Sequence, residues 1–164
     1  MSSTNIFSLK KLVKEYENLS KDEDIPFNVG LVDESYFHWK ILIIGPEDTI
    51  YEGYLLEAII NFPQTYPMSP PSMTFTTKMW HPNIFLNGSV CISILHPPEF
   101  DPTNPDERMD EKWKPVLGVK EIILSILSIL SEPTTDSPAN VEAAIEYRSN
   151  KDEYIKKVKN LLES

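Results

Sequence analysis

Cysteine is almost absent from this chain, whose 164 residues include only one, Cys91. A single cysteine excludes a disulfide within the chain and fits a reducing compartment. Long hydrophobic runs are absent as well. The longest, residues 122–130, is interrupted by two serines, whereas a bilayer span needs about 20 apolar residues. No apolar signal region begins the chain. We therefore expect a cytoplasmic protein without direct membrane insertion.

Basic side chains are outnumbered, because 15 lysines and arginines face 25 aspartates and glutamates, giving a net charge of -10. Such a surface repels a phosphate backbone, so we expect no nucleic acid partner. We also predict no metal site. The length suits one domain spanning residues 1–164, and no repeat or change of composition marks a boundary.

The order of the predicted elements indicates an α+β fold. Helical periodicity in residues 9–19 predicts an amphipathic first helix. Segments rich in β-branched and aromatic residues then predict four antiparallel strands, at 27–32, 36–44, 54–61 and 72–76. A central helix should follow Gly118 and be covered on more than one side. A short helix near residue 141 and a last helix capped by Asn150 complete the chain.

A proline-rich loop, residues 62–71, separates the third and fourth predicted strands. Proline has no amide hydrogen, so this segment cannot continue a sheet and should be stiff. An aromatic residue precedes Pro67, which makes Tyr66-Pro67 a candidate cis peptide bond. Met68 is expected at the tip of the loop.

The most informative stretch surrounds the cysteine. His81-Pro82-Asn83 comes first, an Asn87-Gly88 turn signal follows, and Cys91 lies eight residues after Asn83. An isolated thiol is usually an inert core residue. A rigid loop folded back beside it favours a nucleophile instead.

This stretch resembles the active site of the ubiquitin-conjugating enzymes, in which a His-Pro-Asn tripeptide precedes a thioester-forming cysteine at the same distance. The likeness extends from about Lys10 to the end of the chain and includes Tyr-Pro-Met-Ser-Pro-Pro at 66–71 and Trp-Lys-Pro at 113–115. It is greatest to the subgroup with an acidic insertion after the cysteine. The resemblance implies an N-terminal helix, a four-stranded antiparallel meander, a central helix and two C-terminal helices.

The resemblance implies that Cys91 accepts ubiquitin from an activating enzyme and passes it to a lysine amine, usually with a ligase. Thiolate is a good leaving group, so a thioester on Cys91 would transfer readily to an amine. Asn83 is suited to donate a hydrogen bond to the oxyanion, or to tie its loop together, and both roles can hold.

Four other side chains are candidates near the thiol. His81 and His96 could act as bases, but in the family the histidine of the tripeptide orders the loop. His96 matches the acidic-insertion subgroup. Asp136 and Ser137 match the family's gate, where a carboxylate or hydroxyl orients the incoming lysine, and a plain turn is the alternative.

Two partner surfaces follow from the resemblance. The basic face of the first helix, formed by Lys10, Lys11 and Lys14, would meet the activating enzyme and the ligase, although a solvated face is the alternative. Apolar groups on two irregular segments should form one exposed patch for a ligase domain. This patch comprises Met68, Trp113, Pro115 and Val116.

Residues 97–112 form the acidic insertion, because Trp113 stands 22 positions after Cys91 where the family usually has about eight. Its prolines and its lack of aliphatic side chains predict a mobile, irregular loop. We expect its negative field to govern acceptor encounter and chain building. The carboxylates are Glu99, Asp101, Asp106, Glu107, Asp110 and Glu111.

Three alternatives stay open: a binding-only variant of the fold, conjugation of a ubiquitin-like modifier, and a cysteine hydrolase. The first would be expected to lack the cysteine, and the last needs a basic histidine beside it. No cofactor is expected on this chain, since the activating enzyme uses the ATP. Members of the subgroup can serve at the endoplasmic reticulum through membrane-bound partners, so recruitment there accompanies the cytoplasmic expectation.

Overall fold

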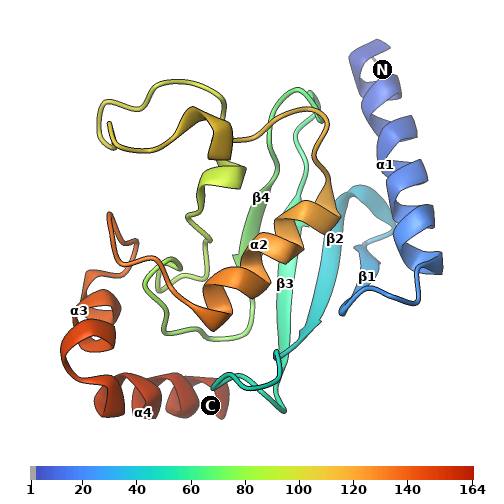
Figure 1. The fold of residues 1–164 in the computed structure, drawn as a ribbon. Helices are drawn as coiled ribbons and strands as arrows, with labels where there is room; N and C mark the ends of the chain where they lie inside the picture. The colour runs from blue at the N-terminus through green and yellow to red at the C-terminus, as the bar shows by residue number, and fades with distance from the viewer. Residues whose placement is uncertain (1–2) are drawn as a thin grey trace.

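A computed structural model describes residues 3–164 and contains one sheet with helices packed around it (Figure 1). The strands follow one another in the order β1-β2-β3-β4, and every neighbouring pair is antiparallel. The predicted α+β meander is therefore confirmed. The elements are α1 (Ser3–Lys21), β1 (Phe27–Val32), β2 (Ser35–Ile44), β3 (Leu55–Asn61), β4 (Ser72–Phe75), the 3-10 turns η1 (Ser93–Leu95) and η2 (Met109–Glu111), α2 (Val119–Ser131), α3 (Val141–Ser149) and α4 (Lys151–Leu162).

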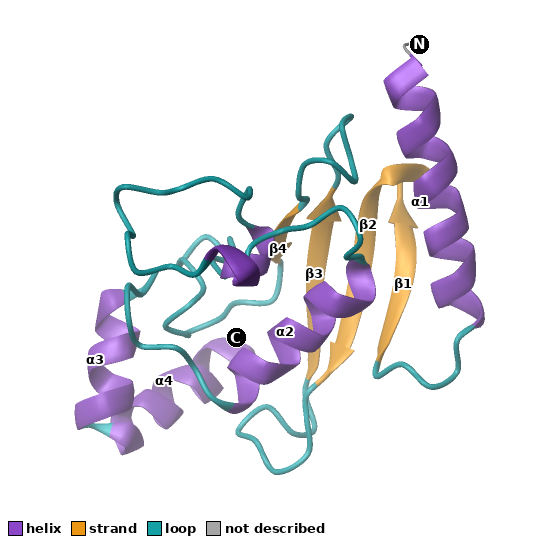
Figure 2. Cartoon of the chain, turned by 45° about the horizontal axis from the view of Figure 1, so that its top comes forward, coloured by secondary structure: helices purple, strands orange, loops and turns teal. Residues whose placement is uncertain are grey.

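Alternation along the strands builds the core. Trp39, Ile41 and Ile43 of β2 are fully buried, and their cross-strand partners on β3 are buried too. Successive side chains of a strand point to opposite faces, so one face of the sheet is apolar. Helix α2 lies across the sheet, as Figure 2 shows, and most of its aliphatic side chains are buried. This agrees with a central helix covered on more than one side.

Helix α1 is attached to α2 through Glu15. One carboxylate oxygen of Glu15 accepts from the backbone N–H of Val119 at 2.7 Å, and the other accepts from the Tyr66 hydroxyl at 2.8 Å. A negative charge at a helix N-terminus is stabilising, because the first amide groups of the helix lack partners. Glu15 thereby fixes the start of α2, the helix that supports the site.

The predicted strand boundaries differ little from those observed, whereas helix α1 is longer than the predicted 9–19 and begins six residues earlier. Strand β1 is as predicted, and the other three strands each begin or end one residue away. Asn150 caps α4 by accepting from the Glu153 N–H. The Tyr66-Pro67 peptide bond is cis, as predicted.

The Asn87-Gly88 turn returns the chain toward β4 before Cys91. Gly88 has φ +95°, and its carbonyl accepts from the Phe75 N–H at 2.8 Å. A Cβ at Gly88 would lie 2.1 Å from the Phe75 carbonyl oxygen. Only glycine fits both the positive φ and this close backbone approach.

We predict that Gly88→Ala lowers the free energy of unfolding by at least about 2 kcal/mol, because the backbone must shift. Gly30→Ala in β1 is the matched control, since a Cβ there meets nothing within 4 Å. That control should change stability by less than about 1 kcal/mol. Urea titration of both variants checks the difference, and equal stabilities would contradict it.

Candidate functional site

The His-Pro-Asn loop is anchored by the buried imidazole of His81. Its Nε2–H donates to the Ile129 carbonyl of α2 at 2.7 Å, and its Nδ1 accepts from the Asn83 N–H at 3.0 Å. Burial lowers the pKa of His81 to about 4, only partly offset by the hydrogen bond to Ile129. Both ring nitrogens are occupied and the ring is neutral at pH 7. His81 therefore orders the loop, as expected, and is not placed to act as a base.

Asn83 ties the same loop to the segment after α2. Its Nδ2 donates to the Thr134 carbonyl at 2.9 Å, and its Oδ1 accepts from the Thr134 N–H at 3.0 Å. Pro82 adds a link to the start of α3, since its carbonyl accepts from the N–H groups of Ala139 and Asn140. The amide of Asn83 has a second N–H beyond the one bound to Thr134. The structural role of Asn83 is thus present, and one donor is left over.

Cys91 lies beside this loop at a cleft of about 480 Å³. Its backbone N–H donates to the Asn83 carbonyl at 2.9 Å, which fixes the distance between the two residues. Its side chain is partly exposed. The cleft wall brings together candidate residues from four segments, namely Asn83, Cys91, His96, Glu107, Asp110, Glu111, Asp136 and Ser137.

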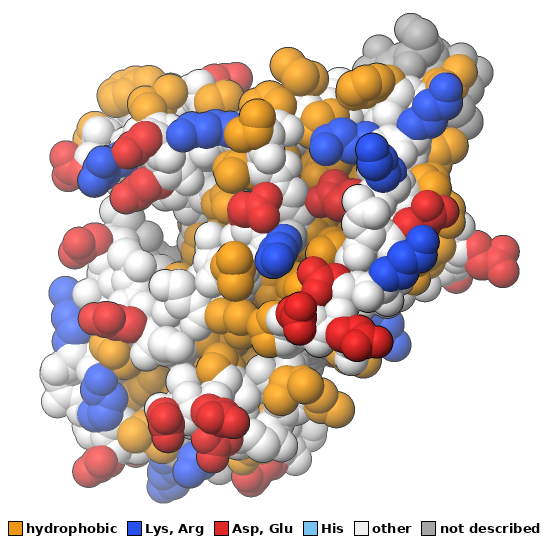
Figure 3. Space-filling view, turned by 45° about the vertical axis from the view of Figure 1, so that its right-hand side comes forward, with side chains coloured by type: hydrophobic (Ala, Val, Ile, Leu, Met, Phe, Trp, Pro, Cys, Tyr) orange, Lys and Arg blue, Asp and Glu red, His pale blue; other side chains and the backbone are white. Residues whose placement is uncertain are grey.

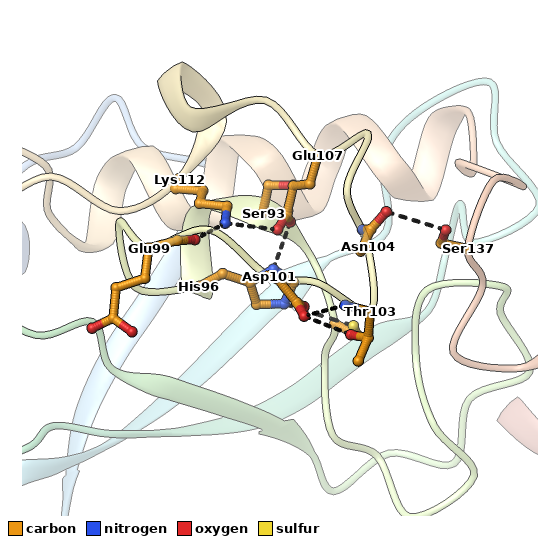
Figure 4. A network of polar contacts seen from close by, with 10 residues as sticks. Ser93, His96, Glu99, Asp101, Thr103, Asn104, Glu107, Lys112 and Ser137 are labelled. Carbon is orange, nitrogen blue, oxygen red and sulfur yellow. Dashed lines mark hydrogen bonds and ion pairs between the residues drawn. The ribbon is translucent and has the colours of Figure 1, made fainter.

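The imidazole of His96 contacts the thiol. Its Nε2 is 3.7 Å from the Cys91 Sγ, and its Nδ1 is 2.6 Å from Glu107 Oε2 (Figure 4). The pKa of His96 is raised to about 9, chiefly by the hydrogen bond to Cys91; burial opposes this rise, and Glu107 adds to it. The structure therefore brings the sequence candidates His96 and Cys91 together and adds a carboxylate behind the ring.

The gate residues lie across the cleft from the insertion. Asp136 and Ser137 are exposed, and Ser137 has φ +50° in its turn. The Ser137 hydroxyl donates to Asn104 Oδ1 at 3.4 Å, a long contact that joins the gate to the insertion (Figure 4). Asp136 and Ser137 therefore lie in a turn and also line the cleft that contains Cys91.

Residues 97–112, predicted as an irregular acidic loop, are not irregular throughout. They contain the short turn η2, and the Glu107 side chain is only 4% exposed. Glu107 accepts from Ser93 Oγ at 2.6 Å and pairs with Lys112 Nζ at 3.3 Å. Glu107 was wrongly grouped with the exposed carboxylates, because the sequence does not reveal that Lys112 is buried beneath the loop. Glu99, Asp106, Asp110 and Glu111 do face solvent.

Trp113 was wrongly assigned to an exposed patch. It is fully buried, its Nε1–H donates to the Pro67 carbonyl at 2.7 Å, and its ring packs 5.8 Å from that of Tyr66. A tryptophan buries a large apolar ring when its one polar atom finds a partner, as it does here. Met68 and Val116 are 67% and 87% exposed, and Pro115 is exposed as well.

The predicted basic face of α1 lines a shallow hollow. Lys10 and Lys14 are exposed and Lys11 is half-buried, and Phe7 and Glu15 share the same hollow. Figure 3 shows basic side chains at its upper right, beside the N-terminal helix. This surface lies on a different part of the molecule from Cys91.

Sequence reasoning missed Ser93, Asn104 and Lys112 as parts of the site. Lys112 is 2% exposed and also donates to the Glu99 carbonyl. The sequence carried no clear signal for this burial, because a lysine in an acidic loop normally indicates a solvated charge. Within residues 3–164, no group of three His, Cys, Asp or Glu side chains is placed to hold a metal ion. None of the described helices is both long and apolar enough to cross a bilayer.

We predict that His81 makes the protein less stable as pH falls from about 6.5 to about 4. The unfolded state binds a proton on this ring near pH 6.5, whereas the folded state resists until about pH 4. Between pH 7 and pH 5 this costs about 2 kcal/mol of stability. Denaturant titrations at both pH values should show a smaller loss for His81→Gln than for wild type. The exposed His38→Gln serves as control, and a loss equal to that of wild type in His81→Gln would contradict the assignment.

Comparison with known proteins agrees with this geometry. Residues 11–162 match the family model described as ubiquitin-conjugating enzyme. The protein named ubiquitin-conjugating enzyme E2 14 of Arabidopsis thaliana is 53% identical over 148 residues, covering 90% of this chain and 88% of its own. Ubiquitin-conjugating enzyme E2 15 of Schizosaccharomyces pombe is 48% identical over 152 residues, covering 92% and 90%. Ubiquitin-conjugating enzyme E2 7 of Triticum aestivum is 52% identical over 134 residues, covering 81% and 79%. This chain therefore belongs to the family of ubiquitin-conjugating enzymes.

Proposed function

We propose that Cys91 carries ubiquitin as a thioester, received from an activating enzyme, and releases it to a lysine amine of a substrate or of another ubiquitin. One observation carries this assignment. The only thiol of the chain is partly exposed at a cleft, where a backbone hydrogen bond from Cys91 to Asn83 holds it beside the His-Pro-Asn loop. An inert core cysteine would be buried among apolar side chains.

The chemistry suits a carrier. Transfer between two thiols exchanges one thioester for another and costs almost no free energy. Attack by an amine then breaks the C–S bond, forms an amide and releases a thiolate, which is a better leaving group than the amine. No cofactor on this chain takes part in the proposal, because the activating enzyme uses the ATP.

We predict that Cys91→Ala forms no adduct when incubated with activating enzyme, ubiquitin and ATP. Cys91→Ser should form an oxyester that survives reducing agent, because an alkoxide leaves far less readily than a thiolate. Non-reducing and reducing gels distinguish these outcomes from the thiol-sensitive adduct of wild type. A normal thiol-sensitive adduct on either variant would remove Cys91 from the assignment.

Asn83 is proposed to act on the oxyanion while it holds its loop. One N–H of its amide binds Thr134, and Asn83 lines the same cleft as Cys91, so the other N–H is the candidate donor to the carbonyl oxygen of the thioester. A donor fixed in place strengthens as negative charge develops on the oxygen. The same residue can therefore support both structure and transfer.

We predict that Asn83→Ala slows discharge of the thioester to free lysine by about 10²-fold, the scale of one lost oxyanion donor. Charging should be less affected. Single-turnover rates of the two steps test this, together with the melting temperature of the variant. Equal slowing of both steps would mean that Asn83 serves only the structure of the loop.

Asp136 and Ser137 are proposed to orient the incoming lysine, since both line the cleft that contains Cys91. A nearby carboxylate stabilises the ammonium form, whereas a hydroxyl can orient the amine without doing so. The two residues would therefore favour encounter and orientation more than proton removal.

Two separate surfaces are proposed for partners. The Lys10, Lys11 and Lys14 face of α1 is proposed to contact the activating enzyme and the ligase. Met68, Pro115 and Val116 are proposed as the ligase anchor, and their exposure supports this role. The fully buried Trp113 is not part of this surface, and its N–H binds the Pro67 carbonyl in the loop that carries Met68.

The exposed carboxylates of the insertion are proposed to attract a lysine ammonium or a basic acceptor surface during chain building. Asp101, Asp110 and Glu111 lie near the cleft, whereas Glu107 is committed to buried partners. Attraction between exposed charges is screened beyond about 10 Å at 0.1 M salt, so the effect should weaken with ionic strength. We also propose that the protein acts in protein degradation. Its proposed location is the cytoplasm, from which partners would recruit it to the surface of the endoplasmic reticulum.

A further inference from the structure

At the cleft, the thiol of Cys91 contacts the imidazole of His96, which in turn contacts the buried carboxylate of Glu107. Cys91 Sγ is 3.7 Å from His96 Nε2, and His96 Nδ1 is 2.6 Å from Glu107 Oε2. Nucleophile, base and orienting carboxylate in this order are the arrangement that activates cysteine and serine nucleophiles in unrelated enzymes. The sequence could not reveal it, because Glu107 follows Cys91 at a distance of 16 residues through an irregular loop.

The backbone of His96 is held by a hydrogen bond at its N–H and another at its carbonyl. The His96 N–H donates to the Ser93 carbonyl at 2.9 Å, and the His96 carbonyl accepts from the N–H of the buried Trp113 at 3.0 Å. Pro97 and Pro98 follow directly and restrict the chain. The ring is 31% exposed, so it is open to the cleft, and its 2.6 Å contact with Glu107 orients it there.

Glu107 is held as firmly as the ring. Ser93 Oγ donates to the same Oε2 that faces His96, and the buried Lys112 pairs with Oε1 at 3.3 Å (Figure 4). A carboxylate at Nδ1 keeps a proton on that nitrogen, which in the neutral ring leaves the Nε2 lone pair facing the sulfur. Glu107 thus keeps Nε2, the nitrogen that gives up and takes back a proton during the cycle, directed at Cys91.

We propose that His96 is a catalytic residue that takes and returns the proton of the thioester cycle, and that Glu107, held by Ser93 and Lys112, is its positioning residue. This inference rests on the proposed role of Cys91 as the carrier. It adds a proton acceptor to a site in which the histidine of the His-Pro-Asn loop cannot serve.

The proton balance of the cycle is complete. With a pKa of about 9, His96 holds the proton that it shares with Cys91 before charging. During charging, Cys91 Sγ bonds to the carbonyl carbon while the bond from that carbon to the sulfur of the activating enzyme breaks, and His96 gives its proton to the departing thiolate. During discharge, the lysine nitrogen bonds to the carbonyl carbon and gives its extra proton to His96. The Sγ–carbonyl bond breaks, and Sγ leaves as a thiolate facing the imidazolium.

The pKa of His96 depends on whether the sulfur of Cys91 is free or bound in a thioester. The charged or titratable groups that face His96 are Cys91, Glu107 and Asp101, with Lys112 behind Glu107. Cys91 is the largest cause that raises the pKa of His96. A thioester sulfur carries neither charge nor proton, so this contribution is lost on charging. The pKa of His96 therefore falls on charging, so a larger fraction of the ring is neutral and can accept a proton from the amine.

Single-turnover charging and discharge to free lysine, measured from pH 6 to pH 9, test the proposal. Wild type is compared with His96→Gln and Glu107→Gln, and His38→Gln, an exposed histidine on β2, is the matched control. We expect His96→Gln to slow both steps at pH 7 by about 10²-fold. Its charging rate should recover toward wild type at pH 9, where hydroxide removes the thiol proton. Glu107→Gln should show a smaller loss with the same recovery.

If His96→Gln charges at a wild-type rate, or at a rate lowered by the same factor at every pH, the histidine only anchors the insertion and the proposal is wrong. If wild type itself forms no thiol-sensitive adduct, the carrier role of Cys91 fails instead.

A second measurement keeps the test valid if either variant folds poorly. The His96 ring is titrated by NMR in wild type and in Cys91→Ala, which leaves the insertion intact. We expect the pKa of His96 to fall in Cys91→Ala, because the sulfur partner is gone. The same pKa in both proteins would overturn the proposed pair.

Discussion

The hydrogen bond from the His81 imidazole to the Ile129 carbonyl is the contact on which the site depends. It joins the loop before Cys91 to the end of α2 and lies wholly inside the protein, where an unpaired ring nitrogen would be costly. Asn83 and Pro82 extend the attachment to Thr134 and to the start of α3. Cys91 is positioned in turn by the Asn83 carbonyl. Movement at α2 would therefore reach the thiol through two residues.

The insertion depends on a second buried polar contact. Glu107 and Lys112 are removed from water together, which costs free energy that their attraction and their additional hydrogen bonds must offset. Ser93, His96 and the Glu99 carbonyl supply those bonds. Losing either member of the pair would leave an uncompensated charge under the loop. The pair fixes the base of the insertion beside the thiol, while the outer carboxylates stay in solvent.

The sequence predicted what depends on local pattern. Strand alternation predicted the four strands within one residue, the Asn150 cap predicted the start of the last helix, and the spacing of Asn83 to Cys91 indicated two residues that line the same cleft. It could not predict contacts between distant segments. Trp113 was predicted to be exposed, but its N–H binds the Pro67 carbonyl and its ring is buried. Glu107 was predicted to be solvated, but it pairs with the buried Lys112. In both cases burial is decided by tertiary packing, which composition and period do not encode.

The central claim is that the acyl group resides on Cys91. The most direct measurement is mass spectrometry of the wild-type protein after incubation with activating enzyme, ATP and ubiquitin, digested without reducing agent. We expect a ubiquitin remnant on the peptide that contains Cys91, lost on addition of thiol, while free Cys91 becomes unavailable to alkylation. Ubiquitin found only on lysine side chains, with Cys91 still open to alkylation throughout the reaction, would contradict the account.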